Sequence, residues 1–263
     1  MPFEKLWYVP YELLPDGDGR ALQPWIENHR VTYVPTLGSY QVAFNNKPVI
    51  RDTVGLFSMF FSTDRQRNEE LAASLGADEV NHHSVSLYQK VTIPSSQLLR
   101  LRTDRLWIAS EIDMTAGWES VSVPLAIGKH ESLGGWLEMP GRGVKQVVFA
   151  GSATSIRTGN LLNGNDIFLP ACATMLSGSQ SVLLSRWPVG GISAANVMQR
   201  YLEEETEVPA SEALRRSVLA MWAERYLTSA EPSLLPVGRE GAQLTSGQHP
   251  VLWSSYMSIG DSR

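Results

Sequence analysis

The chain has 263 residues, 43% of them hydrophobic and 19% charged, and a formal net charge of -5 at pH 7. Such a composition can bury a substantial core and excludes an intrinsically disordered chain. The acidic balance argues against broad, nonspecific nucleic-acid binding, which needs a basic face. The single cysteine, Cys172, excludes an intrachain disulfide and an all-thiolate zinc site within one chain.

The N-terminal residues show no basic region followed by a long apolar one, so no signal peptide is visible. No run of the sequence approaches the ~18 apolar residues that a membrane-spanning helix needs. We therefore expect a cytoplasmic protein that has no membrane or nucleic-acid partner.

Short apolar runs alternate with helical patterns along the chain. Near the N-terminus, residues 6–9 and 31–34 flank a turn-rich stretch and predict a small antiparallel β-ribbon. The clearest strands that follow are residues 54–61, 106–110, 144–150, 181–187 and 254–259. The runs around Val148 and Leu183 are apolar on both faces, which is typical of central strands covered by helices.

Helical spacing of apolar residues predicts three helices. One covers residues 68–75, a second lies behind Ser193 as N-cap, and a third follows Ser211. Strands interleaved with helices indicate an α/β fold, a three-layer sandwich with a central, mostly parallel sheet and helices on both faces. Residues 229–248, rich in proline, glycine and serine, are expected to form a long surface loop before the last strand.

The Gly-rich stretch 151–166 follows a predicted strand but lacks both the phosphate-binding P-loop pattern and the dinucleotide pattern, so we expect no cofactor. Ser152 lies directly after that strand. Its neighbours Ala150 and Thr154 replace the glycines of a nucleophile elbow, which weakens the motif for a serine hydrolase.

The histidines do not form a metal-binding pattern. His82 and His83 are adjacent and would point to opposite faces of a strand, while the other three, His29, His130 and His249, are isolated. We therefore expect no metal centre.

Two other features leave alternatives open. Glu111 and Asp113 would share one face at the end of a predicted strand, where they could hold a divalent cation or do acid–base work, although a solvated strand end is favoured. Cys172 lies in a small-residue helical segment, which favours a buried structural thiol over a nucleophile.

Four segments, taken together and in order, resemble the CHAT domain family, a caspase-like fold related to separase. They are Leu-Trp-Tyr-Val-Pro-Tyr-Glu-Leu-Leu at 6–14, Val-Thr-Tyr-Val-Pro-Thr-Leu at 31–37, Ser-Val-Leu-Leu-Ser-Arg-Trp-Pro-Val at 181–189 and His-Pro-Val-Leu-Trp-Ser-Ser-Tyr at 249–256. Because these segments extend over nearly the whole chain, the resemblance implies a single CHAT-like domain over residues 1–263.

Active members of that family use a His–Cys dyad at the ends of two neighbouring parallel strands. The resemblance places the family histidine on Glu111 and the family cysteine on Ser152, so both dyad positions are substituted. A glutamate is a far poorer proton acceptor at neutral pH than imidazole, and a serine hydroxyl needs a stronger base than a thiol does. Ile112 replaces the family glycine, and Gly190-Gly191 replaces acidic residues.

The resemblance thus implies a CHAT-like domain with no intact catalytic residues, a pseudopeptidase serving interaction or regulation, with Asp113, Gly190 and Gly191 as candidate binding residues. The alternative is an active CHAT-family peptidase, or a serine hydrolase with Ser152 as nucleophile and Glu111 contributing to the base. The resemblance also implies a protein or peptide partner, such as a helical-repeat (tetratricopeptide) region or chain.

Overall fold

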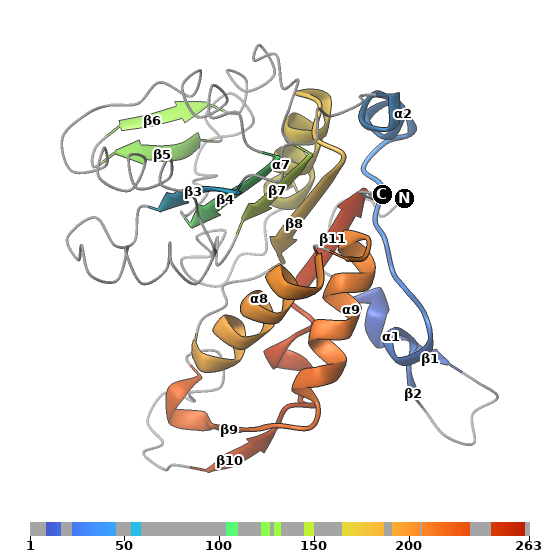
Figure 1. Cartoon of the computed structure of the whole chain (residues 1–263), viewed down its shortest axis with the longest axis vertical. Coiled ribbons are helices and arrows are strands. Elements are labelled where there is room, and N and C mark those ends of the chain that lie inside the picture. The colour runs from blue at the N-terminus through green and yellow to red at the C-terminus, as the bar shows by residue number, and fades with distance from the viewer. Residues whose placement is uncertain are drawn as a thin grey trace.

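The computed structural model describes residues 9–16, 23–45, 54–58, 104–109, 122–126, 129–132, 145–149, 165–186, 191–205, 207–231 and 243–260. Their elements are arranged around one central sheet (Figure 1). Of the predicted elements, the helix over residues 68–75 lies outside the described residues.

The central sheet has five strands, in the spatial order β11-β8-β7-β4-β3. They are β3 (Val54–Ser58), β4 (Arg105–Ala109), β7 (Gln146–Phe149), β8 (Ser181–Ser185) and β11 (Tyr256–Gly260). The first four run parallel, and β11 runs antiparallel to β8. These strands confirm the central part of each predicted strand and the mostly parallel sheet.

The alternation of side chains divides the core into two layers. Leu106, Val147 and Val182 lie opposite one another across β4, β7 and β8 and share one face of the sheet. The next residue on each strand, which is Trp107, Val148 or Leu183, lies on the opposite face of the sheet. Both sets are almost fully buried, which explains why these strands read as continuous apolar runs.

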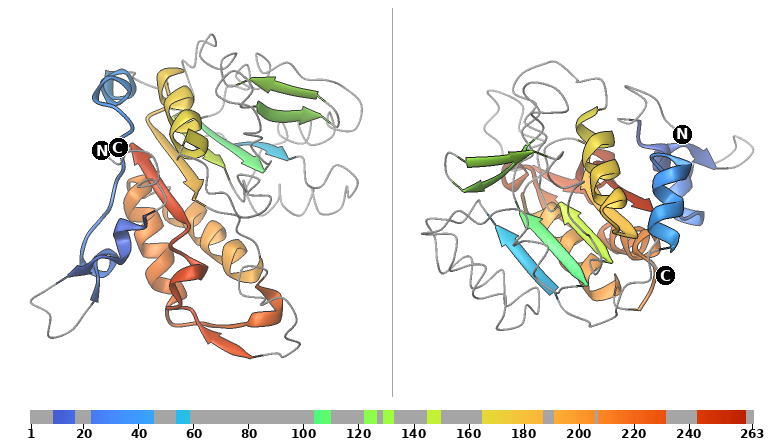
Figure 2. Two further views of the ribbon diagram at one scale, coloured as in Figure 1. Left: turned by 180° about the vertical axis from the view of Figure 1, so that it is seen from behind. Right: turned by 90° about the horizontal axis from the view of Figure 1, so that it is seen from above.

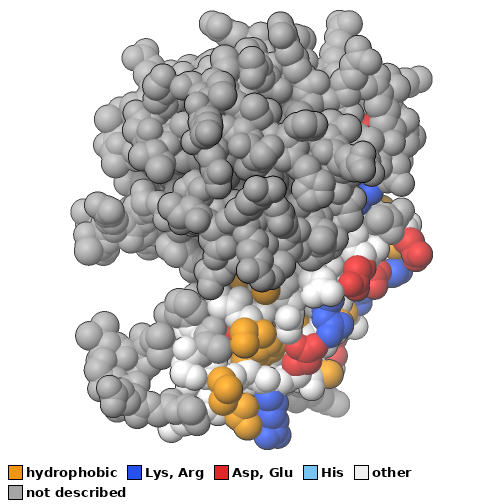
Figure 3. Space-filling model, turned by 60° about the vertical axis from the view of Figure 1, so that its left-hand side comes forward, with side chains coloured by type: hydrophobic (Ala, Val, Ile, Leu, Met, Phe, Trp, Pro, Cys, Tyr) orange, Lys and Arg blue, Asp and Glu red, His pale blue; other side chains and the backbone are white. Residues whose placement is uncertain are grey.

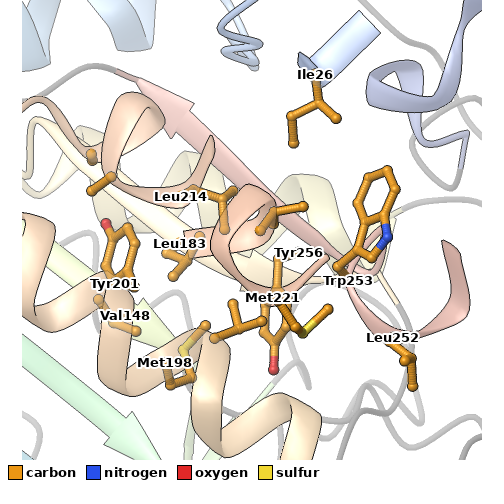
Figure 4. Packing of buried hydrophobic residues seen from close by; sticks show 14 of the residues in the cluster. Ile26, Val148, Leu183, Met198, Tyr201, Leu214, Met221, Leu252, Trp253 and Tyr256 are labelled. Atoms are coloured by element: carbon orange, nitrogen blue, oxygen red, sulfur yellow. The ribbon is translucent and has the colours of Figure 1, made fainter. Parts of the chain in front are cut away.

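Helices cover both faces (Figure 2). α8 (Gly191–Glu205) and α9 (Ala210–Met221) pack on the face that carries Trp107, Val148 and Leu183, and α7 (Asn165–Leu176) packs on the other face. Figure 4 shows the first of these layers, which contains residues of the strands, α8, α9 and the turn before β11. Ile26, from the N-terminal segment, belongs to the same cluster of buried residues.

Both predicted late helices are present, but the predicted N-cap at Ser193 is wrong. α8 begins two residues before Ser193, and α9 begins at Ala210 behind Pro209, one residue before Ser211. Both serines are buried in the first helical turn. Burial against the core, rather than helix capping, therefore accounts for serine at these positions.

An N-terminal ribbon is present between other residues than the two predicted runs; residues 6–8 of the first predicted run lie outside the described residues. The two-residue strands β1 (Pro15–Asp16) and β2 (Gln23–Pro24) pair antiparallel. Tyr33, in the segment predicted to form the second ribbon strand, instead makes a parallel bridge to Ile259, donating to the Ser258 carbonyl (2.9 Å) and accepting from Gly260 N (2.8 Å). This segment satisfies its hydrogen bonds by extending the edge of the central sheet.

The rest of the N-terminal segment is short and helical. It comprises the 3-10 turn η2 (Tyr11–Leu13), α1 (Trp25–Asn28) and α2 (Leu37–Asn45). The antiparallel pair β5 (Ser122–Ala126) and β6 (Lys129–Ser132) was not predicted.

The segment over residues 229–248, predicted to be a long surface loop, contains regular structure in part. β9 (Arg225–Leu227) pairs antiparallel with β10 (Leu244–Ser246), the 3-10 turn η3 (Thr228–Ala230) follows β9, and η5 (Pro250–Leu252) precedes β11. In the described part of the chain, no helix is long and apolar enough to cross a membrane.

One glycine is fixed by the geometry of β11. Gly260 has a φ of 71°, and a Cβ on it would lie 2.3 Å from the carbonyl oxygen of Gln180. Only glycine adopts this conformation without strain and permits so close a backbone approach. It allows β11 to end against the turn that leads into β8.

Candidate functional site

The parallel strands β4, β7 and β8 end side by side, and the carboxyl ends of such strands are where α/β proteins place ligand sites. β4 pairs with β7 in a register that sets Ile108 opposite Phe149, 41 positions later. Glu111 and Ser152 are also 41 positions apart (152 − 111 = 41). The register of the two strands therefore agrees with the spacing of the two positions predicted for the dyad.

Most of the predicted site residues lie outside the described residues: Glu111, Asp113, Ser152 and Gly190. Gly191 is described. It is the exposed first residue of α8 and has a φ of 90°, a conformation that favours glycine. The entry into the helix is thus sufficient to explain glycine at this position.

A buried ion pair lies at the carboxyl end of β8. Arg186, the residue after the strand, is fully buried, and its Nη2 donates to both carboxylate oxygens of Glu12, each at 3.0 Å. Its Nη1 donates to the carbonyl oxygens of Ser254 (2.7 Å) and Tyr256 (2.9 Å). Arg186 therefore connects the end of β8 to the N-terminal segment and to the start of β11.

Tyr33 completes this cluster. Its hydroxyl accepts from Arg186 Nη2 (2.5 Å), donates to Glu12 Oε2 (2.9 Å) and accepts from the Tyr11 backbone N–H (3.2 Å). The guanidinium carbon of Arg186 also lies 5.0 Å from the centre of the Tyr33 ring, within the range of a cation–π interaction. Burial raises the pKa of the Tyr33 hydroxyl well above its ordinary value, so the group remains a neutral donor.

This cluster has a structural role. Glu12, Tyr33 and Arg186 are each at most 5% exposed, so no substrate reaches their charged or hydroxyl groups. The cost of burying a carboxylate and a guanidinium is offset when the two groups pair and make further hydrogen bonds. The cluster holds the N-terminal segment against the end of β8, at the edge of the candidate site.

Sequence reasoning did not identify this cluster, although two signals were present. Arg186 is a charged residue at the end of an otherwise apolar strand, where a buried charge needs a partner. The CHAT-like strand pattern has leucine at that position. Glu12 and Tyr33 fall within the two N-terminal segments that resemble the family, but their pairing with Arg186 spans 174 and 153 residues, which no local pattern reveals.

A second buried carboxylate holds the start of α8. Glu231 Oε1 accepts from the Ser193 backbone N–H at 2.9 Å, and Glu231 Oε2 accepts from the Ser193 hydroxyl at 2.5 Å. A carboxylate at this place satisfies an N–H of the first helical turn and interacts favourably with the helix dipole. Glu231 therefore fixes the first turn of α8, the helix that follows β8 along the chain.

At the opposite, amino ends of β4 and β7 lies another buried polar cluster. The Gln146 carboxamide lies between the Tyr201 hydroxyl and the Glu205 carboxylate, and Arg105 Nε is 3.8 Å from Glu205 Oε1. With its nitrogen toward Glu205 and its oxygen toward Tyr201, the carboxamide bonds to both. This cluster ties α8 to the sheet and is remote from the strand ends that carry the dyad positions.

Cys172 has the environment of a structural thiol. It lies in α7, partly buried, and burial raises its pKa to about 11. The thiolate is the nucleophilic form, so a thiol with a raised pKa is a poor nucleophile at neutral pH. This favours the structural interpretation of Cys172 made from the sequence.

The described histidines have local roles. His29 Nε2 lies 3.0 Å from Asp16 Oδ2 on the surface, and His249 Nδ1 accepts from the Val251 backbone N–H at the start of η5. His82 and His83 lie outside the described residues, and of His130 only the backbone is described. Within the described ranges, no group of three or more histidine, cysteine or acidic residues could hold a metal ion.

A mostly parallel sheet between helical layers, with both dyad positions following neighbouring strands, defines a protein of the caspase-like α/β class. The family model described as the CHAT domain matches residues 131–261, and the chain belongs to the CHAT domain family. The match includes Ser152 and the elements from β7 to β11, whereas Glu111, β3 and β4 precede it. A comparison with curated proteins finds no match.

Proposed function

We propose that this chain is a non-catalytic CHAT-like domain, a pseudopeptidase that acts by binding a protein or peptide partner. The observation that carries the proposal is the pair of substitutions at the dyad positions, Glu111 for histidine and Ser152 for cysteine. Without imidazole and thiol, the peptidase chemistry of the family lacks both its base and its nucleophile.

The strand register supports this assignment of positions. β4 and β7 are adjacent and parallel, with an offset of 41 residues between Ile108 and Phe149, the same as between Glu111 and Ser152. This agreement supports the positions that the resemblance assigns to the dyad, Glu111 and Ser152.

The properties of Cys172 also support a non-catalytic domain. A replacement nucleophile would need a lowered pKa and access to substrate, whereas burial raises the pKa of this thiol to about 11. Meanwhile the scaffold around the strand ends contains a buried ion pair between Arg186 and Glu12. An ordered scaffold without an intact dyad supports a role in binding rather than in turnover.

We further propose that the domain extends over residues 1–263, beyond the family match. β3 and β4 precede that match but belong to the same sheet as β7, β8 and β11, and Tyr33 adds to the edge of that sheet. The partner class proposed is a protein or peptide, including a tetratricopeptide region or chain, in the cytoplasm.

The experiment is a digest of a proteome-derived peptide library by the full chain, combined with labelling by a fluorophosphonate probe. We expect no cleavage and no labelling, and we expect Ser152→Ala to behave as the wild type. Ser229→Ala, at an exposed serine of η3, is the matched control. Cleavage or labelling that is lost in Ser152→Ala but kept in Ser229→Ala would overturn the proposal in favour of a serine hydrolase.

A further inference from the structure

The antiparallel pair β9–β10 has one buried and one exposed face. Tyr226 points inward and is 3% exposed. The outward face carries Arg225 and Leu227 from β9 and Leu244 and Ser246 from β10; we call these four residues the ribbon face. Figure 3 shows hydrophobic side chains beside a basic one at the lower end of the molecule, where Figure 1 places β9 and β10.

The two leucines of the ribbon face form a contiguous apolar pair. Leu227 lies directly opposite Leu244, and they are 46% and 60% exposed. Two backbone hydrogen bonds lie at the two ends of the β9–β10 pair: Thr228 N donates to the Gln243 carbonyl (2.8 Å), and Gly247 N donates to the Glu224 carbonyl (2.9 Å). The antiparallel alternation then places Leu227 and Leu244 at a non-hydrogen-bonded position, where opposed side chains approach most closely.

The same alternation leaves strand edges open to another strand. At non-hydrogen-bonded positions the backbone N–H and C=O groups point away from the partner strand, so those of Leu244 point to the outer edge of β10. Within the described residues, β9 and β10 form a sheet of two strands. An extended segment can therefore add to this edge by backbone hydrogen bonds.

Arg225 gives the ribbon face its charge. Three other described arginines, Arg200, Arg215 and Arg216, each contact a glutamate. Arg225 is exposed and has no acidic partner in the part of the chain that the structure describes. An unpaired cation beside an exposed leucine pair is complementary to a segment that offers a carboxylate and an apolar side chain.

The ribbon is held in place before any partner binds. A Cβ on Gly247 would lie 1.9 Å from the Met221 carbonyl oxygen, so the backbone after β10 packs directly on the end of α9. The Tyr226 hydroxyl donates to Glu224 Oε2 at 2.6 Å, and the Tyr226 ring belongs to the core beneath α8. A surface that is already ordered loses little conformational entropy on binding.

We propose that the ribbon face binds an extended peptide segment of a partner protein, in which an apolar residue packs on Leu227 and Leu244 and an acidic residue pairs with Arg225. Arg225 and Leu227 are two positions apart on one strand, and side chains two positions apart share one face of an extended partner. The recognised pattern is therefore an apolar and an acidic residue two positions apart: acidic-x-apolar in a segment that runs antiparallel to β10, and apolar-x-acidic in one that runs parallel to it. This inference rests on the proposed binding function and names its surface and partner.

The experiment is selection of a displayed library of random twelve-residue peptides on the full chain, followed by fluorescence anisotropy of the selected peptides. We expect enrichment of peptides with an apolar and an acidic residue two positions apart. Affinity should fall about tenfold in Arg225→Glu and in Leu244→Ser, as truncation of a contact residue or reversal of a contact charge typically does. Leu37→Ser removes a 74% exposed leucine of α2 and is the matched control, expected to bind as the wild type.

Selected peptides without that pattern, or equal affinities for all variants, would overturn the proposal. Concentration-dependent self-association that Leu244→Ser abolishes would also overturn it, because the occupant would then be a second copy of the chain. The test of the ribbon face and the test of the non-catalytic role can fail independently of each other. Labelling of Ser152 would refute the non-catalytic role and leave peptide binding at the ribbon face untouched.

Discussion

Removal of the Glu12 carboxylate is the most informative perturbation of the scaffold. Arg186 is fully buried, and Glu12 supplies two of the five acceptor contacts of its guanidinium group. In Glu12→Ala the guanidinium keeps two carbonyls and the Tyr33 hydroxyl but loses its counter-charge. An uncompensated buried charge typically destabilises a protein by about 3–5 kcal/mol, which is a large fraction of the stability of a domain.

Two further variants separate charge from packing. Glu12→Gln retains an acceptor of similar shape, so its loss of stability should be smaller than that of Glu12→Ala. The double variant Glu12→Leu with Arg186→Leu removes both charges together. Because replacing a buried ion pair by apolar residues is often nearly neutral, the double variant should be more stable than Glu12→Ala.

The assay is urea unfolding of the full chain followed by tryptophan fluorescence, for which the buried Trp107 and Trp253 are suitable reporters. Asp16→Ala is the control, because it removes the carboxylate of a surface contact with His29 and should cost less than about 1 kcal/mol. The reasoning is refuted if Glu12→Ala costs no more than Asp16→Ala, or if the double variant is no more stable than Glu12→Ala.

Three further predictions concern other described residues. Burial raises the pKa of Cys172 to about 11, so its rate of alkylation by iodoacetamide, followed by mass spectrometry, should keep rising up to about that pH. A plateau near pH 8.5 would contradict this. Glu231→Ala removes the acceptors of the Ser193 N–H and hydroxyl and should cost about 1–2 kcal/mol in urea unfolding. Ser193→Ala should add little to it, and fully additive losses would disprove the coupling. The Tyr226 hydroxyl is the largest cause of the lowered pKa of Glu224, so Tyr226→Phe should raise that pKa toward its ordinary value in a carboxyl NMR titration. The lowered pKa contributes stability above the unfolded-state pKa of Glu224, lost as the pH falls through the folded-state pKa. An unchanged pKa would show that the hydroxyl is not the cause.

The sequence patterns predicted the features that depend on residues close together in the chain. The central positions of five strands, the helix that contains Cys172 and the two late helices follow from apolar runs and helical spacing, because each element buries one or both faces. The predicted N-cap at Ser193 was wrong for the same reason. Burial in the core and a bond to the distant Glu231 outweighed the local capping preference of serine.

The candidate site could be predicted in part. The spacing of Glu111 and Ser152 matches the register of β4 and β7, so the strands that deliver these positions were correctly identified as neighbours. The properties of Cys172 agree with the sequence prediction of a structural thiol. The pairing of Arg186 with Glu12 could not be predicted, because the two residues are 174 positions apart and each has many possible partners in the sequence.

The sequence by itself determined the α/β class and the order of the central strands along the chain. These are properties of residue type and short-range periodicity. The tertiary structure alone decided that Tyr33 bridges to the edge of the central sheet, that Glu12 pairs with the buried Arg186, and that the two leucines of the ribbon face lie exposed on the same face as Arg225. Such contacts join distant parts of the chain, and only the packing of the whole fold determines which polar groups and apolar surfaces meet.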